Sequence, residues 1–188
     1  TVAVAYRESR LIGKHLSHIP DWVDEKLVLV SEKPWFGSEL PDDGTAQIAR
    51  DHGATVIEYP WENETDQRNS GQEYLSEYEW VIVLDPDEFL DNINWMMLKK
   101  ELENPHAKAY VVGGQYTYWK NGYVADPPRD YNMLIACKPS VKFIDKRVVD
   151  SPFQFSQVWL HHMSWVKTDE EVWNKISHYA HAQDFDIK

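Results

Sequence analysis

The chain has 188 residues, and its 31 acidic and 19 basic side chains give a formal net charge of −12 with histidine neutral. A chain this acidic is unsuited to binding nucleic acid through a broad basic surface. Its 43% hydrophobic and 27% charged residues are typical of a globular protein and exclude disorder as the main state. The longest apolar runs, 27–30 and 80–84, fall far short of the roughly 20 residues of a membrane helix, so we expect no transmembrane segment.

Cysteine usage bears on the compartment. Cys137 is the single cysteine, so the chain can form no intrachain disulfide and no cysteine-based zinc cluster. The free thiol and the lack of a visible signal sequence favour a reducing compartment, and we expect the protein in the cytoplasm. The residues after Thr1 already have the pattern of a strand, so we expect this sequence to begin inside a longer chain.

The first half of the chain alternates short apolar runs with longer amphipathic stretches. This pattern predicts strands over 2–6, 26–31, 55–59 and 79–84, and helices over 9–19, 44–52 and 66–78, the last with Thr65 as its N-cap. The unbroken run 80–84 indicates burial on both faces and favours a parallel sheet. The alternation predicts an α/β fold with a mixed, mainly parallel sheet, helices on both faces, and ligands beyond the carboxyl ends of the strands.

The second half loses this alternation and resembles a set of hairpins. Strands are predicted over 110–119, 131–138, 141–149 and 157–163, separated by Asn-Gly, Pro-Pro and Pro-Ser turns. A capping box, Thr168 followed by Glu171, predicts a last helix over 168–181. We expect a single domain over 1–188, with a nucleotide-binding half of about 1–90 and an acceptor-side half of about 91–188.

Three carboxylates follow the buried strand directly, in Asp85-Pro86-Asp87-Glu88. The end of a parallel strand would direct them into a solvated cleft, where hard oxygen ligands suit Mg²⁺ or Mn²⁺ completed by phosphate oxygens and water. The alternative is a polar turn before a helix capped by Asp91, but capping explains one carboxylate and leaves the others unexplained.

Two segments carry a resemblance to a known family. The run WVIVLDPDEFL at 80–90 resembles the strand and Asp-x-Asp motif of GT-A fold, nucleotide-sugar-dependent glycosyltransferases of the family-two type, and Gln67-Arg68-Asn69-Ser70-Gly71 resembles their Arg-Asn-x-Gly segment. The order and spacing of both are similar to the family's. The later segment 160–165, LHHMSW, and the lysine-containing helix after it resemble a subset of these enzymes.

The resemblance implies a role for each matching residue. Asp87 would ligate a divalent ion, Mn²⁺ or Mg²⁺, that bridges the two phosphates of the donor, while Asp85 would contact the ribose or reach the metal through water, with Pro86 between them. Arg68 would bind the diphosphate. The alternative for Arg68 is a solvated residue in the first turn of its helix, paired with Glu64 or Asp66.

A late histidine is a further metal ligand in many GT-A enzymes, which implicates His161 or His162. Neighbouring residues of a strand point to opposite faces, so at most one of them should reach the metal, and we prefer His162. A hydrogen-bonded structural histidine is the alternative for either residue.

The donor's base and ribose should lie over the ends of the first two strands. This placement implicates Ala5, Tyr6, Arg7 and Glu32, although the family's paired aspartates are replaced here by Ser31-Glu32-Lys33. Tyr6 could equally belong to the core. Among the many aromatic residues, most of which we expect in the core, Trp119 or Tyr123 could contact the acceptor.

The function that follows is metal-assisted transfer of a sugar from a nucleoside diphosphate sugar, with a UDP-sugar favoured, to a hydroxyl of a glycan or glycoprotein acceptor. An inverting enzyme also needs a carboxylate base, and the candidates are Asp126 and Asp150, with Asp130 and Asp145 also available. The family's Glu-Asp pair is missing, so a retaining course stays open. The alternatives are a phosphohydrolase with Asp85 as nucleophile and a carbohydrate-binding domain without catalysis.

Overall fold

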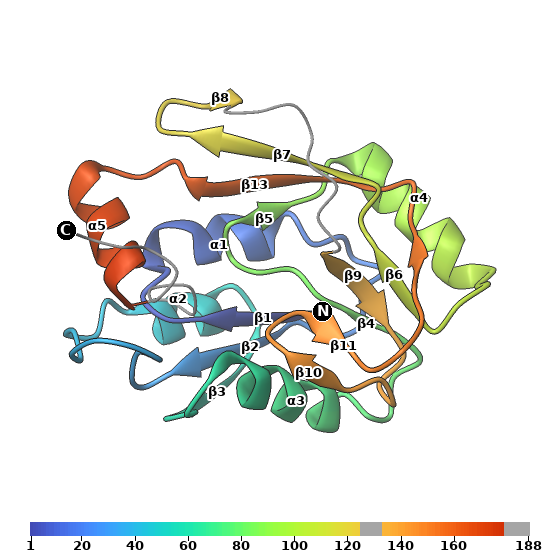
Figure 1. Ribbon diagram of the computed structural model, residues 1–188, viewed down its shortest axis with the longest axis horizontal. Helices are drawn as coiled ribbons and strands as arrows, with labels where there is room; N and C mark the ends of the chain where they lie inside the picture. The colour runs from blue at the N-terminus through green and yellow to red at the C-terminus, as the bar shows by residue number, and fades with distance from the viewer. Residues whose placement is uncertain (125–132, 179–188) are drawn as a thin grey trace.

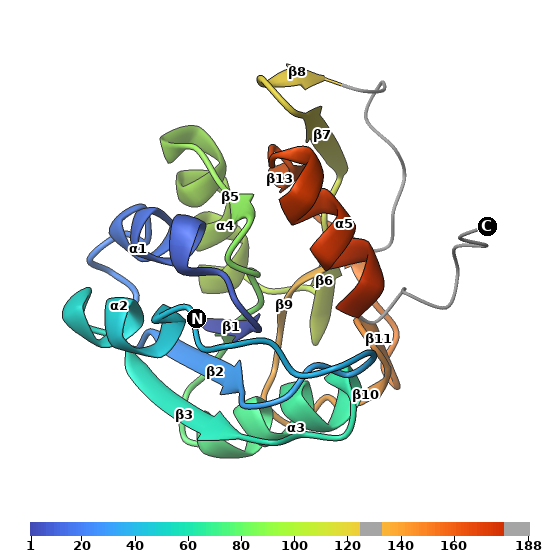
Figure 2. The ribbon, with the colours of Figure 1, turned by 90° about the vertical axis from the view of Figure 1, so that its left-hand side faces the viewer.

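Three parallel strands near the N-terminus form a sheet with helices on both faces (Figures 1 and 2). The computed structural model describes residues 1–124 and 133–178. Strands β1 (Val2–Ala5), β2 (Leu27–Ser31) and β3 (Thr55–Tyr59) pair in that order. Helices α1 (Ser9–Ser17) and α2 (Thr45–Asp51) share a core with one face, and α3 (Glu64–Tyr74) packs on the other. The predicted alternation of strands and helices is confirmed here.

Helix α3 lies unusually close to this sheet. A Cβ atom on Gly71 would lie 2.9 Å from a methyl carbon of Val2 and 3.0 Å from one of Leu29, so glycine permits the close packing.

The N-cap of α3 differs from the prediction, since the prediction of Thr65 as N-cap is wrong. Asn63 caps the helix by accepting a hydrogen bond of 2.8 Å from the Asp66 amide, and the Thr65 hydroxyl instead accepts one of 2.9 Å from the Lys146 amide. The helix therefore starts two residues earlier than predicted, and it ends at Tyr74, four residues before the predicted end.

The strand before the Asp-x-Asp turn is short, and its pairing differs from the prediction. Strand β4 (Val81–Ile82) pairs antiparallel with β9 (Leu134–Cys137), and its parallel contact with β1 is limited to a bridge between Val2 and Val83. The apolar run correctly indicated burial on both faces, because Val81 and Val83 are buried in one core cluster while Ile82 and Leu84, on the opposite face, are buried in the other. Burial of both faces of a strand does not determine whether the neighbouring strand runs parallel or antiparallel. This explains why the predicted parallel pairing of the strand was wrong.

The second half forms further small sheets in place of one continuous mixed sheet. The predicted strand 110–119 is divided into β6 (Ala109–Val111) and β7 (Gly114–Trp119), which belong to different sheets. The division falls at Gly113, where a Cβ atom would lie 2.4 Å from the Ser156 carbonyl oxygen. The chain can cross there only without a side chain, so one apolar run supplies two sheets.

Two four-stranded sheets and a hairpin result. One sheet has the order β12-β6-β9-β4, with β12 at Gln154–Phe155. The other has the order β5-β13-β7-β8, with β5 at Glu88–Phe89, β13 at Trp159–Trp165 and β8 at Tyr123–Val124. The predicted strand 141–149 is a hairpin of β10 (Phe143–Asp145) and β11 (Val148–Val149).

Two helices complete the described chain. Helix α4 (Asn92–Glu103) is capped by Asp91, which accepts a 2.8 Å hydrogen bond from the Asn94 amide. Helix α5 (Asp169–His178) begins at the predicted capping box, with reciprocal hydrogen bonds of 2.7 and 3.2 Å between Thr168 and Glu171. The fold is therefore mixed α/β with several small sheets. None of the described helices has the length and apolar character needed to cross a membrane.

Candidate active site

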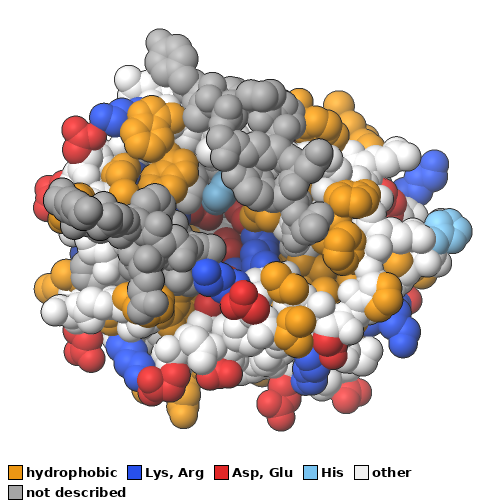
Figure 3. Space-filling view, in the orientation of Figure 1, with side chains coloured by type: hydrophobic (Ala, Val, Ile, Leu, Met, Phe, Trp, Pro, Cys, Tyr) orange, Lys and Arg blue, Asp and Glu red, His pale blue; other side chains and the backbone are white. Residues whose placement is uncertain are grey.

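A pocket of about 390 Å³ lies beyond the carboxyl ends of β1 and β4, and β13 and α5 form its other walls. Figure 3 shows acidic, basic and histidine side chains meeting in a depression of the surface. Although the chain carries a net charge of −12, basic side chains line this pocket from five segments: Arg7, Arg10, Arg68, Arg147, Lys167 and Lys175. The same lining also holds seven carboxylates, so the basic side chains offset these charges and supply individual cationic groups to an anionic ligand.

Arg68 and Asp85 form a buried ion pair at the back of the pocket. Two guanidinium nitrogens of Arg68 donate hydrogen bonds of 3.2 and 2.7 Å to the Asp85 carboxylate, and a third bond of 2.8 Å goes to Glu64. Arg68 is 1% exposed, so it is a buried residue and not the solvated one of the alternative interpretation. Although burial opposes ionisation of Asp85, Arg68 and Arg147 lower its pKa. Arg68 thus fixes the first carboxylate of the turn.

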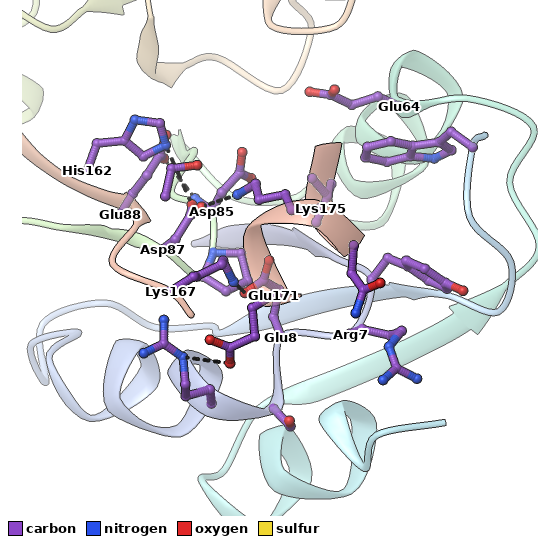
Figure 4. Close-up of a pocket in the computed structure, with 18 of the residues that line it drawn as sticks. Arg7, Glu8, Glu64, Asp85, Asp87, Glu88, His162, Lys167, Glu171 and Lys175 are labelled. Atoms are coloured by element: carbon purple, nitrogen blue, oxygen red, sulfur yellow. Dashed lines mark hydrogen bonds and ion pairs between the residues drawn. The ribbon is translucent and has the colours of Figure 1, made fainter. Parts of the chain in front are cut away.

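Asp87 occupies the centre of the site (Figure 4). Its Oδ2 accepts a 2.6 Å hydrogen bond from Nζ of Lys175, and its Oδ1 lies 3.8 Å from Nε2 of His162. Asp87 lines the pocket after β4, as expected of a carboxylate directed into a cleft, but it is only 4% exposed. Burial opposes ionisation, but Lys175, His162 and Lys167 hold the pKa of Asp87 far below its usual range. The carboxylate is ionised at neutral pH because the ammonium groups of Lys175 and Lys167 lie near it.

Glu88 closes the turn on itself. Its carboxylate accepts a 2.8 Å hydrogen bond from the Asp85 amide and forms an ion pair with Arg147. The Arg147 guanidinium also donates to the backbone oxygens of Val83 and Leu134, at 3.0 and 2.7 Å. Arg147 belongs to the β10–β11 hairpin, so this contact joins the hairpin to the Asp-x-Asp turn.

His15 supports the turn from α1. The ring is 2% exposed, and its Nδ1 donates a 3.0 Å hydrogen bond to the backbone oxygen of Glu88. Burial lowers the pKa of His15 from 6.5 to about 4, so the ring stays neutral in the folded chain. The unfolded chain binds a proton there below pH 6.5, which favours unfolding as the pH falls.

We expect His15→Asn to flatten the dependence of stability on pH. Between pH 6.5 and about 4, the wild type should lose roughly 1–3 kcal/mol more free energy of unfolding than the variant, because asparagine keeps a donor near the Nδ1 position and does not titrate. Urea denaturation at a series of pH values measures this difference. Parallel profiles for the two proteins would show that His15 does not carry the effect.

The segment between β13 and α5 is joined to the turn after β1 by a second ion pair. Nζ of Lys167 lies 3.2 Å from Glu8, and both side chains are largely buried. Burial raises the pKa of Glu8, while Lys175 and Lys167 act in the opposite direction. Arg10 donates to the backbone oxygen of Val166 and pairs with Glu171 at 3.5 Å. The first and last described segments of the chain therefore meet at the pocket.

The two adjacent histidines point to opposite faces of β13. His162 lines the pocket, and its Nδ1 lies 3.2 Å from the side-chain amide nitrogen of Gln115. The other ring nitrogen of His162, Nε2, is therefore the one directed toward Asp87. His161 instead stacks on Tyr116 at a centroid distance of 5.4 Å and hydrogen-bonds the Tyr118 hydroxyl at 2.8 Å. Of the two, only His162 lies in a position to share a ligand with Asp87.

Asp87 and His162 could together hold a divalent ion. Burial lowers the pKa of His162, which favours the neutral ring that a metal requires. Within residues 1–124 and 133–178, no group of three or more acidic, histidine or cysteine side chains is arranged to bind a metal. Mg²⁺ sites commonly use one or two protein ligands with substrate phosphates and water, so the pair suits an ion that arrives with a diphosphate.

The candidate donor-binding residues divide into two groups. Tyr6, Arg7 and Pro86 line the pocket, and the Tyr6 hydroxyl accepts a 3.1 Å hydrogen bond from the Leu40 amide. Ala5 is buried in the core cluster beneath, and Glu32 is exposed outside the pocket lining. The structure therefore places the residues after β1 at the pocket, but it does not place Glu32, the candidate after β2, there.

The two candidate bases that the structure describes, Asp145 and Asp150, lie away from the pocket lining. Asp126 and Asp130 lie outside the described residues. Asp150 is exposed and accepts a 2.9 Å hydrogen bond from the Lys142 amide in the β10–β11 hairpin, and Asp145 is exposed in the same hairpin. Neither is among the residues that line the pocket.

The candidate acceptor contacts are only partly described. Trp119 is 42% exposed and packs on Trp165 at a centroid distance of 5.9 Å. The side chain of Tyr123 lies outside the description. The exposed Trp119 ring, beside the half-buried Trp165, is a surface on which a sugar ring can stack.

Sequence reasoning singled out the lysine-containing helix after 160–165, but it did not assign Lys167, Lys175 or Arg147 to the site. Glu171, Asn174 and Lys175 have the spacing of one helical face, and that face lines the pocket. The capping box located the helix, but nothing in its own pattern showed which face meets the Asp-x-Asp turn. Arg147 lies in a hairpin, and no sequence pattern around it indicated that it would reach the pocket.

Comparison with known proteins places this chain in the class of mixed α/β folds that includes a glycosyltransferase. Crystal structures of that enzyme, Staphylococcus aureus TarS, are similar to this chain. One TarS structure has a TM-score of 0.56 at 11% identity, and the match covers 86% of this chain and 36% of the TarS chain. A structure of TarS 1–349 has a TM-score of 0.55 at 12% identity, and the match covers 87% of this chain and 59% of that TarS chain. At such identity the likeness shows a shared fold.

A sequence relative is the TPR repeat-containing protein Synpcc7942_0270 of Synechococcus elongatus. It is 29% identical over 136 residues, which are 72% of this chain and 31% of that protein. This chain thus spans about a third of that relative and of the longer TarS chain. No family model matches the chain.

Proposed function

We propose that this chain is a GT-A type glycosyltransferase domain that transfers a sugar from a nucleoside diphosphate sugar, with UDP as the favoured nucleotide, to a hydroxyl of a glycan or glycoprotein. In this proposal residues 1–90 bind the nucleotide and residues 91–188 form the acceptor side. The observation that carries it is the Asp87–His162 pair, 3.8 Å apart, in a cation-lined pocket beyond β1 and β4. Its TarS-like fold adds support, since TarS 1–349 forms complexes with UDP-GlcNAc and with UDP.

A divalent ion, Mn²⁺ or Mg²⁺, is part of this proposal, with Asp87 and His162 as its protein ligands. Such an ion would neutralise the diphosphate and stabilise its departure as a Lewis acid. Arg68 keeps Asp85 ionised and immobile, while Tyr6 and Arg7 form the wall beside the end of β1. The turn therefore presents a preformed carboxylate, which avoids an ordering cost when the donor binds.

The alternative functions fit these contacts less well. A phosphohydrolase would need Asp85 as a free nucleophile, but both carboxylate oxygens accept hydrogen bonds from Arg68. A carbohydrate-binding domain would have no use for a buried Asp87 facing a histidine and a lysine. The geometry favours the glycosyltransferase over both.

Thermal unfolding with nucleoside diphosphates, with and without Mn²⁺, tests the proposal. We expect UDP at about 100 times its dissociation constant to raise the melting temperature by roughly 5–10 °C, because binding to the folded state stabilises it by about 2.7 kcal/mol. EDTA should remove the shift. A shift that persists in EDTA would contradict the metal, and the absence of a shift with UDP, GDP, ADP and CDP would contradict the proposed function.

A further inference from the structure

Each of four carboxylates in the pocket already has a cationic partner, and the partners differ in how firmly they are held. The pairs are Asp85 with Arg68, Glu88 with Arg147, Glu8 with Lys167, and Asp87 with Lys175. Both arginines make further hydrogen bonds, to Glu64 or to backbone oxygens, and are therefore fixed. The lysines are single charges on flexible stems and can exchange one anion for another.

Lys175 has the more central position of the two lysines. Its side chain reaches from α5 to Asp87, and His162 approaches the same carboxylate from another side (Figure 4). Among the described residues, Asp87 is its hydrogen-bond partner, at 2.6 Å. The Lys175 side chain is 15% exposed, and the residue lines the pocket. Its ammonium is therefore within reach of an anion that enters.

A divalent ion at Asp87 would change the charge balance around Lys175. The lysine contacts Oδ2, whereas Oδ1 faces His162, so an ion on the His162 side would share the same carboxylate. The ion and Lys175 would then share the Asp87 charge, and the largely buried Lys175 ammonium would keep only Glu8 and Asp85, with which it makes no hydrogen bond, as further counter-charges. A phosphate oxygen would supply a counter-charge that also accepts a hydrogen bond.

We propose that Lys175 is a diphosphate-binding residue, which neutralises Asp87 in the nucleotide-free protein and contacts a phosphate oxygen when a nucleoside diphosphate and Mn²⁺ are bound. This inference rests on the proposed function. It gives α5 a direct part in donor binding. It also explains why a helix from the far end of the chain places a lysine in a pocket that already holds five other basic residues.

The proposal requires opposite effects on two ligands. Replacing Lys175 by glutamine removes a positive charge next to Asp87, so Mn²⁺ alone should bind the nucleotide-free protein about tenfold more tightly. The same change removes a charge-assisted hydrogen bond to phosphate, so UDP in saturating Mn²⁺ should bind roughly ten- to a hundredfold more weakly. Uridine, which lacks phosphate, should bind equally well to both proteins. A lysine that only supports the fold would not give opposite signs.

The experiment compares wild type, Lys175→Gln, Lys175→Arg and a control at pH 7.5. Electron paramagnetic resonance of free Mn²⁺ measures metal binding, and calorimetric titration measures UDP and uridine binding. Lys120→Gln is the matched control, because Lys120 also pairs with α5, at 2.6 Å from Asp169, but on an exposed surface. We expect the control to match the wild type, and Lys175→Arg to keep most of the UDP affinity.

The outcomes separate this inference from the proposed function. If wild type binds UDP with Mn²⁺ and Lys175→Gln binds both ligands as the wild type does, Lys175 has no part in the site and the function stands. Weaker binding of Mn²⁺ and UDP together in Lys175→Gln would instead show a structural role and overturn the inference. If wild type binds neither UDP nor another nucleoside diphosphate, the proposed function fails and the inference fails with it.

Discussion

Replacing Asp87 by asparagine is expected to abolish Mn²⁺-dependent binding of UDP. Asparagine keeps the shape of the side chain and an oxygen that can accept the Lys175 hydrogen bond, but it removes the charge that a divalent ion needs. Because Asp87 is 4% exposed and paired, we also expect some loss of stability, so the variant must be shown to be folded by circular dichroism. Calorimetric titration of UDP in Mn²⁺ is the measurement.

Asp91→Asn is the matched control for this substitution. Asp91 follows the same turn but caps α4 and lies 3.7 Å from His161, on the face turned away from the pocket. Asparagine is an equally good N-cap, so neither stability nor UDP binding should change. Unchanged UDP affinity in a folded Asp87→Asn protein would exclude Asp87 as a metal ligand.

Arg68→Ala should cause the largest loss of stability. The substitution leaves Asp85 and Glu64 without their shared partner in a place where Arg68 itself is 1% exposed. Removing one member of a buried pair costs about 3–5 kcal/mol, and we expect the lower end of this range because Arg147, 3.7 Å away, still partly compensates the Asp85 charge. Urea denaturation at pH 7 measures the change in the free energy of unfolding.

Arg50→Ala provides the comparison on the surface. Arg50 pairs with Glu58, and both side chains are more than 40% exposed, so its loss should cost no more than about 1 kcal/mol. Arg68→Lys should fall between the two, since lysine keeps the charge but cannot bind both Asp85 oxygens in parallel. If Arg68→Ala costs as little as Arg50→Ala, the buried pair does not stabilise the fold.

The first half of the fold could be predicted because its signals are local. Strands β1, β2 and β3 and helices α1 and α2 lie within the predicted ranges, since apolar periodicity and Gly or Pro boundaries act over a few residues. The break at Gly113 could not be predicted, because it depends on the Ser156 backbone 43 positions later. The pairing of β4 with β9 likewise depends on a distant segment.

The site shows the same division. The position of the Asp85–Glu88 turn follows from the strand before it, and the opposite orientation of His161 and His162 follows from strand alternation. The ion-pair partners of these residues could not be predicted in the same way. Lys175 lies 88 positions from Asp87, and Arg147 lies 59 positions from Glu88. A single sequence contains no signal that pairs charges over such separations.

The contact between Glu8 and Lys167 joins positions 159 apart, and so it also has a consequence for folding kinetics. Closing so long a loop costs chain entropy that local contacts do not repay, which makes such contacts late events in folding. Segment β1 to β3 can form from neighbouring units, whereas the wall made by α5 must wait for nearly the whole described chain. During synthesis, the Asp85–Glu88 turn would therefore emerge well before Arg147 and Lys175, its later cationic partners, and the pocket would be the last region to close.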